Sequence, residues 1–262
     1  MNISQAYETI RCHLAERVAK ITLNRPDTLN AINVTMIQEL NHCLKELAAN
    51  EHIQIVVLQG SGKGFSSGGD IKSMLASNHL NFDDVMDEIS ELALRLFTLP
   101  KFVIAAIHGA AAGLGFSLAL NADRIIAEKD SKFAMNFIGI GLIPDGGGHY
   151  LLAQRVGVQK AKEIIWEGRV MPAEDAYLYG LVDELVEGDL QAYVDQYVKQ
   201  LLRTPLLAKI ETKRLMAEWK KDELQHILKR EKEGQRKMRQ TKDHLEGIQA
   251  FLEKRMPQFH GR

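Results

Sequence analysis

The sequence predicts an α/β fold with a largely parallel sheet, and three observations support this. Residues 53–59 and 102–107 are apolar runs rich in β-branched residues, as expected for buried strands. A glycine-rich turn follows each run, and the amphipathic helical pattern of residues 82–98 lies between them. Strands that alternate with helices usually pair in parallel within one sheet. We therefore expect both turns at the same edge of that sheet.

The first 49 residues predict a hairpin followed by a helix. Residues 7–14 and 18–24 alternate like two strands around a turn at 15–17. Pro26 ends the second strand, and Asn33 is suited to cap a helix that runs to about residue 49.

The middle of the chain continues the alternation of strands and helices. The turn 109–113 is expected to lead into a helix at 114–121, followed by short strands at 124–127 and 132–134. Residues 144–148 then open another helix. The nearly uncharged stretch 102–120 is long enough to suggest a membrane span. Because a histidine and three glycines interrupt it, a buried strand and a buried helix explain it better.

From about residue 189 the strand pattern stops. Residues 189–202, 205–217, 221–242 and 243–256 read as charged helices. We divide the chain into an α/β core with the site, residues 1–188, and a helical region, residues 189–262. The helical region is expected to cover the site or to form subunit contacts.

Bulk composition excludes several functions. The 262 residues include 33 basic and 34 acidic side chains, so no net field attracts nucleic acid or a membrane surface. Cys12 and Cys43 are typical of reduced thiols in a cytoplasmic protein, and we expect no signal peptide because no basic region followed by an apolar run is present at the N-terminus. No cluster of ligating residues has metal spacing, so we expect no metal.

The two glycine-rich turns, GSGKGFSSGGD (60–70) and HGAAAGLGFS (108–117), allow three interpretations. Phosphate binding fits poorly, because no Ser or Thr follows Lys63 as a P-loop requires. A serine hydrolase would use Ser66 of the Gly-x-Ser-x-Gly pattern at 64–68, with a base such as His149. In the third interpretation, each turn donates one backbone N–H to a carbonyl oxygen and together they form an oxyanion hole.

The chain resembles the crotonase superfamily, which includes enoyl-CoA hydratases and isomerases. The blocks that carry the resemblance are NRPDTLNAIN (24–33), GFSSGGDI (64–71), KFVIAAIHGAAAGLGFSLALNAD (101–123), GIGLIPDGGG (139–148), GRVMPAEDAYLYGLVDELV (168–186) and AFLEKR (250–255). The resemblance implies a crotonase-like ββα spiral core with a C-terminal helical trimerisation region. It also implies a homotrimer or a dimer of trimers.

The resemblance further implies an acyl-CoA substrate, with coenzyme A as part of that substrate and no permanently bound cofactor. The N–H groups of Gly69 and Leu114 would be the oxyanion donors. The positions that would contact the substrate are Asn24, Arg25, Ser67, Gly68, Asp70, Ile71, Gly113, Ser117 and Phe137. Phe251 and Lys254 would reach the coenzyme A of a neighbouring subunit, although Lys254 also fits a solvated surface lysine.

The chain departs from the hydratases of this family at two positions. Those enzymes use two glutamates to add water, and the corresponding positions here are Ser117 and Phe137. A serine hydroxyl is no base at neutral pH, and a phenylalanine has no proton to give. Ser117 could equally be a small residue packed in a helix. Phe137 is most simply interpreted as a wall of the acyl pocket.

One carboxylate, Asp145, lies in the expected region, in the turn Leu-Ile-Pro-Asp-Gly. An aspartate at this position moves the proton in some isomerases of the superfamily, and residues 109–148 look most like isomerases of phenylacetyl-CoA breakdown. Asp145 also fits an N-cap of a helix over 146–156. Capping would lower its pKa and the apolar neighbours would raise it, and the sequence does not settle the balance.

The sequence therefore predicts an enoyl-CoA isomerase that shifts a 3-enoyl double bond to the 2-position, with Asp145 as its acid/base. A hydratase, a serine hydrolase through Ser66 and a non-catalytic acyl-CoA binder are the alternatives. Phe137, Leu142, Ile143 and residues 72–97 are expected to shape the acyl pocket. The acyl chain, and the choice between fatty-acid and aromatic pathways, stay open.

Overall fold

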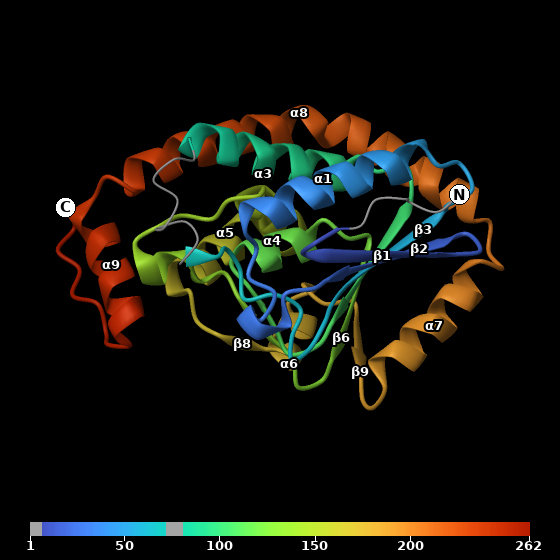
Figure 1. Ribbon diagram of the computed structural model, residues 1–262, viewed down its shortest axis with the longest axis horizontal. Coiled ribbons are helices and arrows are strands. Elements are labelled where there is room, and N and C mark those ends of the chain that lie inside the picture. Colours follow the sequence, from blue (N-terminus) through green and yellow to red (C-terminus); the bar gives the residue numbers. More distant parts are fainter. Residues whose placement is uncertain (1–6, 72–80) are drawn as a thin grey trace.

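The computed structural model describes residues 7–71 and 81–262. Within these ranges, the main sheet has six strands in the order β1-β2-β3-β4-β6-β9 (Figure 1). Their bounds are β1 (Ile10–Ala15), β2 (Val18–Leu23), β3 (Ile55–Gly60), β4 (Phe102–Ile107), β6 (Arg124–Glu128) and β9 (Glu184–Val186). β1 and β2 form the antiparallel hairpin that the sequence predicts, and the other neighbouring pairs are parallel. The prediction of a largely parallel sheet is confirmed.

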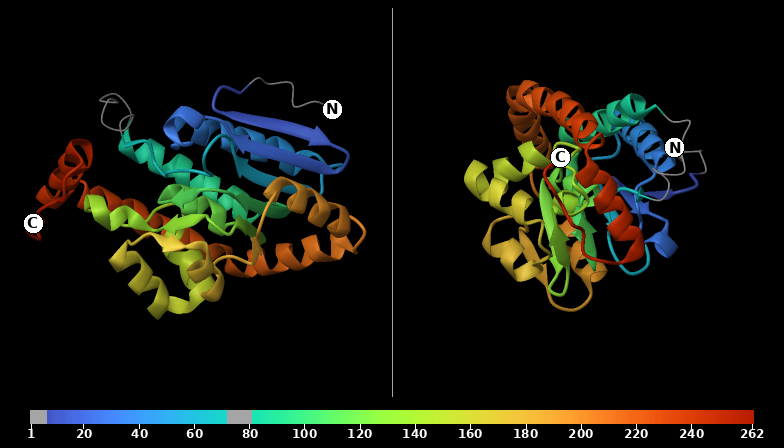
Figure 2. Two further views of the ribbon diagram at one scale, coloured as in Figure 1. Left: turned by 90° about the horizontal axis from the view of Figure 1, so that it is seen from below. Right: turned by 90° about the vertical axis from the view of Figure 1, so that its left-hand side faces the viewer.

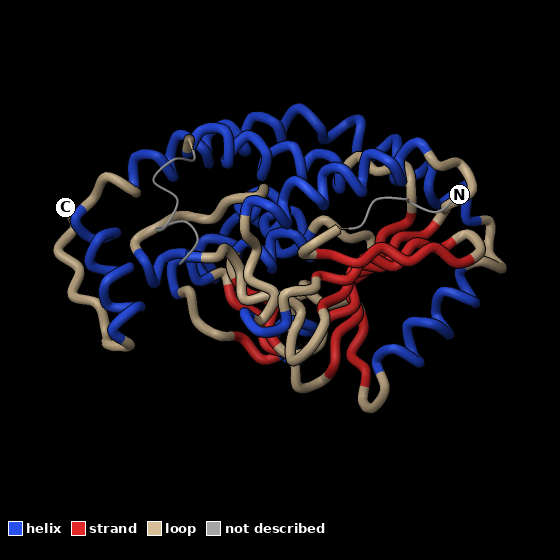
Figure 3. Tube along the Cα trace, in the orientation of Figure 1, coloured by secondary structure: helices blue, strands red, loops and turns tan. Residues whose placement is uncertain are grey.

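A smaller sheet joins β5 (Ala110–Ala112), β7 (Lys132–Ala134) and β8 (Met171–Pro172) (Figure 3). β5 falls inside the stretch that the sequence analysis treated as a plain turn, so that prediction was incomplete. These residues are extended because they pair in parallel with β7, and because Ala111 also forms a bridge with Ser66.

The helices and 3-10 turns of the core mostly follow the predicted pattern. They are η1 (Pro26–Thr28), α1 (Val34–Ala49), α3 (Phe82–Phe97), α4 (Leu114–Leu120), η2 (Asn136–Ile140), α5 (Gly148–Glu167) and α6 (Ala173–Leu178). Asn33 caps α1 as expected, because its side-chain oxygen accepts the N–H of Met36 at 2.9 Å.

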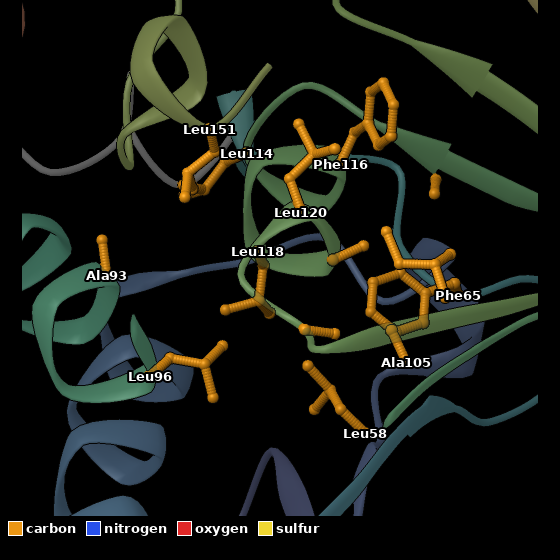
Figure 4. Packing of buried hydrophobic residues seen from close by; sticks show 14 of the residues in the cluster. Leu58, Phe65, Ala93, Leu96, Ala105, Leu114, Phe116, Leu118, Leu120 and Leu151 are labelled. Atoms are coloured by element: carbon orange, nitrogen blue, oxygen red, sulfur yellow. The ribbon is translucent and has the colours of Figure 1, made fainter. Parts of the chain in front are cut away.

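The sheet is covered on both faces because its strand residues alternate in direction. Val56, Leu58 and Ala105 belong to one large hydrophobic cluster with α1, α3 and α4. Val57 and Ile104 belong to a second cluster with α7 (Leu190–Leu201) on the opposite face. Figure 2 shows this layering, and Figure 4 shows the core around α4, where Leu118 lies among side chains of α3 and β3.

The C-terminal region contains α8 (Leu206–Met238) and α9 (Lys242–Glu253). The prediction of two helices at 205–217 and 221–242 was wrong, since α8 is one helix of 33 residues. The three residues between the predicted helices, Glu-Trp-Lys, include no helix breaker. α8 runs alongside α3 (Figure 1), and the ion pairs Arg236–Asp83 and Lys232–Asp87, both 2.6 Å, join the two helices.

Among the described helices, none combines the length and the apolar character that a membrane span requires. The uncharged stretch 102–120 forms β4, β5 and α4. Cys12 and Cys43 are free thiols.

Candidate active site

The loops that follow β3 and β4 lie side by side. The two strands pair in parallel, so their carboxyl ends meet at one edge of the sheet. Backbone hydrogen bonds then continue the pairing: the N–H of Ser66 donates to Ala110 O at 2.9 Å, and the N–H of Ala112 donates to Ser66 O at 3.0 Å. The structure thus brings together the two glycine-rich turns that the sequence singled out.

Glycines allow this close approach. A Cβ on Gly115 would lie 2.6 Å from Cβ and Oγ of Ser66, and a Cβ on Gly68 would lie 2.8 Å from Ala112 O. Gly68 also has a φ of +97°, a value that residues with a side chain rarely adopt. These two glycines are therefore needed for space, and Gly68 for its backbone conformation as well.

The N–H groups of Gly69 and Leu114 are available to a ligand. Gly69 is flanked by two bonds to Ile32, from Ile32 N–H to Gly68 O at 2.8 Å and from Asp70 N–H to Ile32 O at 3.0 Å. Leu114 is the first residue of α4. Neither N–H donates a hydrogen bond to another described residue. Unpaired donors at the start of a helix favour a negatively charged oxygen.

The side chain of Ser66 is buried and hydrogen-bonded, as is typical of a structural residue. Its side chain is 0% exposed, its hydroxyl donates to Asn30 O at 2.8 Å, and Gly68 N–H donates to it at 3.2 Å. No described histidine contacts this hydroxyl; His108 pairs with Gly62 O and His149 pairs with Glu231. The geometry does not favour Ser66 as a nucleophile.

Ser117 and Phe137 occupy packed positions near these turns. Ser117 is fully buried in α4, where its Oγ would lie only 2.8 Å from a Cβ on Gly148. Phe137 belongs to η2, and its ring would lie 3.8 Å from a Cβ on Gly113. Neither side chain carries an acidic or basic group.

The turn that carries Asp145 packs directly on α4. A Cβ on Gly146 would lie 2.7 Å from Cδ1 of Leu114 and 3.4 Å from Cβ of Ser117. The structure thus brings this turn beside the turn at Leu114. Asp145 is 9% exposed, and its Oδ2 accepts a hydrogen bond from Nε2 of Gln235 at 3.3 Å. Its Oδ1 is buried and has no hydrogen-bond partner among the described residues.

The environment of Asp145 favours the protonated carboxyl. Burial, and to a smaller extent the nearby charge of Glu231, raise its pKa to about 8, and a hydrogen bond with the Asp145 backbone opposes both effects. A pKa of this size suits a group that both takes and returns a proton near neutral pH.

The interpretation of Asp145 as a helix N-cap was wrong. α5 begins at Gly148, its N-cap is Gly147, and no side chain of the cap residue bonds to the helix. A carboxylate from α8 replaces it: Glu231 accepts the N–H of Gly147 at 2.8 Å and that of His149 at 3.1 Å. The positive φ angles of Gly146 and Gly147 place Asp145 outside the first helical turn.

Glu231 and Gln235 are site residues that the sequence analysis missed. Both lie in the charged helical tail, where neither stands out from its neighbours. Each is only 2% exposed. A weak signal exists, because Leu224, Leu228, Glu231 and Gln235 follow the three- and four-residue spacing of one helix face.

The residues expected near coenzyme A form a loose group around the first turn. Nη1 of Arg25 bonds to Oδ2 of Asp70 at 2.8 Å and to Ala31 O at 2.6 Å. Ser67 is exposed, while Asn24 and Ile71 are partly exposed. Of the expected pocket segment 72–97, residues 72–80 lie outside the described part of the chain.

Phe251 and Lys254 lie apart from this group, at the end of α9. Phe251 is 54% exposed, and Lys254 ends the helix with a φ of +55°. α9 packs against η2, and a Cβ on Gly247 would lie 2.7 Å from the backbone of Ile140. In Figure 1 this helix stands at the end of the molecule away from the hairpin.

A metal centre is not apparent among the described residues, where no group of three or more His, Cys, Asp or Glu side chains is arranged to hold a metal ion.

Known structures share this architecture. An enoyl-CoA hydratase from Mycobacterium avium subsp. paratuberculosis K-10 superposes with a TM-score of 0.89 and 33% identity, over 97% of this chain and 100% of that one. The fold and the paired glycine turns define a protein of the crotonase class, and the predicted fold is confirmed.

A model described as enoyl-CoA hydratase/isomerase matches residues 13–262, and the chain belongs to this family of acyl-CoA enzymes. YhaR of Bacillus subtilis strain 168, named for the same family, is 51% identical over 243 residues, 92% of this chain and 95% of its own. The 1,2-epoxyphenylacetyl-CoA isomerase of Escherichia coli strain K12 is 35% identical over 97% of this chain and 99% of its own. Relatives are named both hydratase and isomerase, so membership alone does not select the reaction.

Proposed function

We propose that this enzyme shifts the double bond of an enoyl-CoA from the 3-position to the 2-position, with Asp145 as its single acid/base. The observation that carries the proposal is the buried carboxyl of Asp145, which has one unpartnered oxygen and belongs to a turn packed on Leu114. By the resemblance described above, Ser117 and Phe137 occupy the positions of the two glutamates that the hydratases of this family use.

In the proposed reaction the carboxylate of Asp145 takes a proton from C2 of the 3-enoyl thioester. The C2–H electron pair enters the conjugated system and gives a dienolate, whose negative charge collects on the thioester oxygen. The N–H groups of Gly69 and Leu114 stabilise that oxygen. The Asp145 acid then returns the proton to C4, which leaves the double bond between C2 and C3. No water is added, and one acid/base group suffices.

The remaining substrate contacts are part of the same proposal. Asn24, Arg25 and the residues of the first turn would hold coenzyme A, and Phe137 would form a wall of the acyl pocket. Phe251 and Lys254 would contact coenzyme A bound to a neighbouring subunit of a trimer or hexamer. The exposure of Phe251 on α9 supports that arrangement.

The test is Asp145→Asn, assayed by conversion of a 3-enoyl-CoA to the 2-enoyl-CoA. We expect kcat to fall by about 10²- to 10⁴-fold, the usual contribution of a general acid or base. Asp130→Asn, the same change at an exposed position, is the matched control and should keep wild-type turnover. Unchanged turnover in Asp145→Asn would remove the assignment.

Two further assays separate the alternatives. A hydratase would add water to crotonyl-CoA at a rate comparable to isomerisation, whereas we expect hydration to be very slow. A non-catalytic binder would hold acyl-CoA without exchanging its C–H protons into deuterated water, whereas the proposed enzyme should catalyse that exchange. Labelling of Ser66 by a fluorophosphonate would favour a serine hydrolase instead.

A further inference from the structure

Two buried polar side chains of α8 face the turn that carries Asp145. Glu231 and Gln235 are each 2% exposed and lie four residues apart, on one face of the helix. Gly234 lets the helix approach closely, since a Cβ there would lie 2.4 Å from Cδ1 of Ile143. α8 therefore packs directly on the turn.

Gln235 holds the carboxyl group itself. Its Nε2 donates to Ile143 O at 2.5 Å and to Oδ2 of Asp145 at 3.3 Å. One amide group thus ties the side chain of Asp145 to the backbone two residues earlier. With Oδ2 held in this way, the unpartnered Oδ1 is the oxygen left for a substrate proton.

Glu231 holds the segment that follows Asp145. Its Oε2 accepts the N–H of Gly147 at 2.8 Å, and its Oε1 accepts from His149 through the backbone N–H at 3.1 Å and the ring Nδ1 at 2.8 Å. A buried carboxylate needs such compensation for its lost hydration. Here the compensating donors are the first N–H groups of α5, so Glu231 fixes where the turn ends and the helix begins.

We infer that Glu231 and Gln235 are positioning residues for Asp145: Gln235 orients its carboxyl group, and Glu231 fixes the turn that presents it. This inference rests on the proposed acid/base role of Asp145. Both residues act through Asp145 and through the turn.

We expect the two residues to have opposite effects on the protonation of Asp145. The negative charge of Glu231 disfavours the Asp145 carboxylate. The amide N–H of Gln235 donates a hydrogen bond to Oδ2, and a donated hydrogen bond favours a carboxylate. Among the described residues, Glu231 is the one charged group that acts on Asp145 in this way, and His149 faces Glu231 rather than Asp145. A helix that served only to cover the site would not produce opposite effects.

The experiment compares Glu231→Gln and Gln235→Met by ¹³C NMR titration of the Asp145 carboxyl carbon, assigned by its loss in Asp145→Asn. We expect Glu231→Gln to lower the titration midpoint and Gln235→Met to raise it, each by about one unit, as is typical for a neighbouring charge or donor. We also expect kcat of isomerisation to fall about tenfold or more in both variants, with KM within about twofold, since misplaced groups lose rate rather than binding.

Glu233→Gln is the matched control, because Glu233 lies two residues from Glu231, is partly exposed and pairs with Arg230. It should leave both the midpoint and kcat unchanged. Wild-type midpoints and kcat in Glu231→Gln and Gln235→Met would overturn the inference, as would shifts of the same sign in both variants. If Glu231→Gln does not fold, Glu231→Asp keeps the charge and should keep the high midpoint with a reduced kcat, and wild-type kcat there would overturn the inference.

The readouts separate this inference from the proposed function. Wild-type isomerisation by Asp145→Asn would refute the acid/base role and the inference that rests on it, whatever the titrations give. A loss of activity in Asp145→Asn, together with unshifted midpoints and normal kcat in the two α8 variants, would refute the inference alone.

Discussion

The two halves of the candidate site are held in place by different means. Backbone hydrogen bonds and glycines hold the turns that present the N–H groups of Gly69 and Leu114. Side chains of α8 hold the turn of Asp145, across sequence separations of 84 and 90 residues. The backbone half offers fixed dipoles that most side-chain substitutions leave unchanged. In the proposed reaction the side-chain half sets the proton chemistry, and we expect single substitutions to retune it.

Within the backbone half, the largest expected effect comes from removing one of its N–H donors. Leu114 is the first residue of α4, where proline is tolerated because that N–H has no helical partner. Leu114→Pro should therefore leave the helix in place and lower kcat by about 10²- to 10³-fold, as the loss of an oxyanion donor does. Leu114→Met keeps the N–H and nearly the same volume, and it should stay close to wild type. Equal kcat values in the two variants would exclude this N–H as a donor.

A smaller effect is expected from separating the two turns. Gly115→Ala places a Cβ 2.6 Å from Ser66, so one turn must shift. We expect a loss of about 1–3 kcal/mol in the free energy of unfolding, the usual cost of overpacking, together with reduced turnover. Urea unfolding measures the first effect and the isomerisation assay the second.

Gly139→Ala is the control for this substitution, because nothing lies within 4 Å of a Cβ there and its φ is not left-handed. A Gly115→Ala enzyme with the stability and turnover of Gly139→Ala would show that the contact between the turns can relax.

The sequence allowed the backbone half to be predicted in some detail, because its signals are local. Buried strands end in glycine runs, and parallel pairing brings those runs to one edge. The strand character of residues 110–112 was missed because it depends on pairing with β7 and with Ser66, which no local pattern encodes.

The side-chain half was predicted only in part. Asp145 was identified from its turn, but its role as a helix cap was wrong and its partners were missed. The carboxylate that bonds to the start of α5 comes from Glu231, in a helix whose sequence reads as a solvated charged surface. Burial of that face follows from how α8 packs, which a single sequence does not reveal.

The pH dependence of kcat/KM tests the side-chain half, which contains Asp145. Asp145 must be ionised to take the proton, and burial raises its pKa to about 8 in the free enzyme. We therefore expect kcat/KM to rise about tenfold per pH unit below this value and to level off above it, because kcat/KM reports ionisation of the free enzyme. A flat profile between pH 6 and pH 9 would contradict the assignment of Asp145 as the base.

The smallest expected effect concerns stability, and it shows what the buried acid costs the fold. The pKa of Asp145 rises from 3.8 to about 8 on folding, so between these values the folded state keeps a proton that the unfolded state has released. Wild-type stability then falls as pH rises through this window, whereas Asp145→Asn has no proton to lose there. The advantage of the variant in urea unfolding should grow by about 1.3 kcal/mol between pH 5 and pH 6. A constant difference across that range would mean that Asp145 is not held protonated, and the side-chain half would then be no more adjustable than the backbone half.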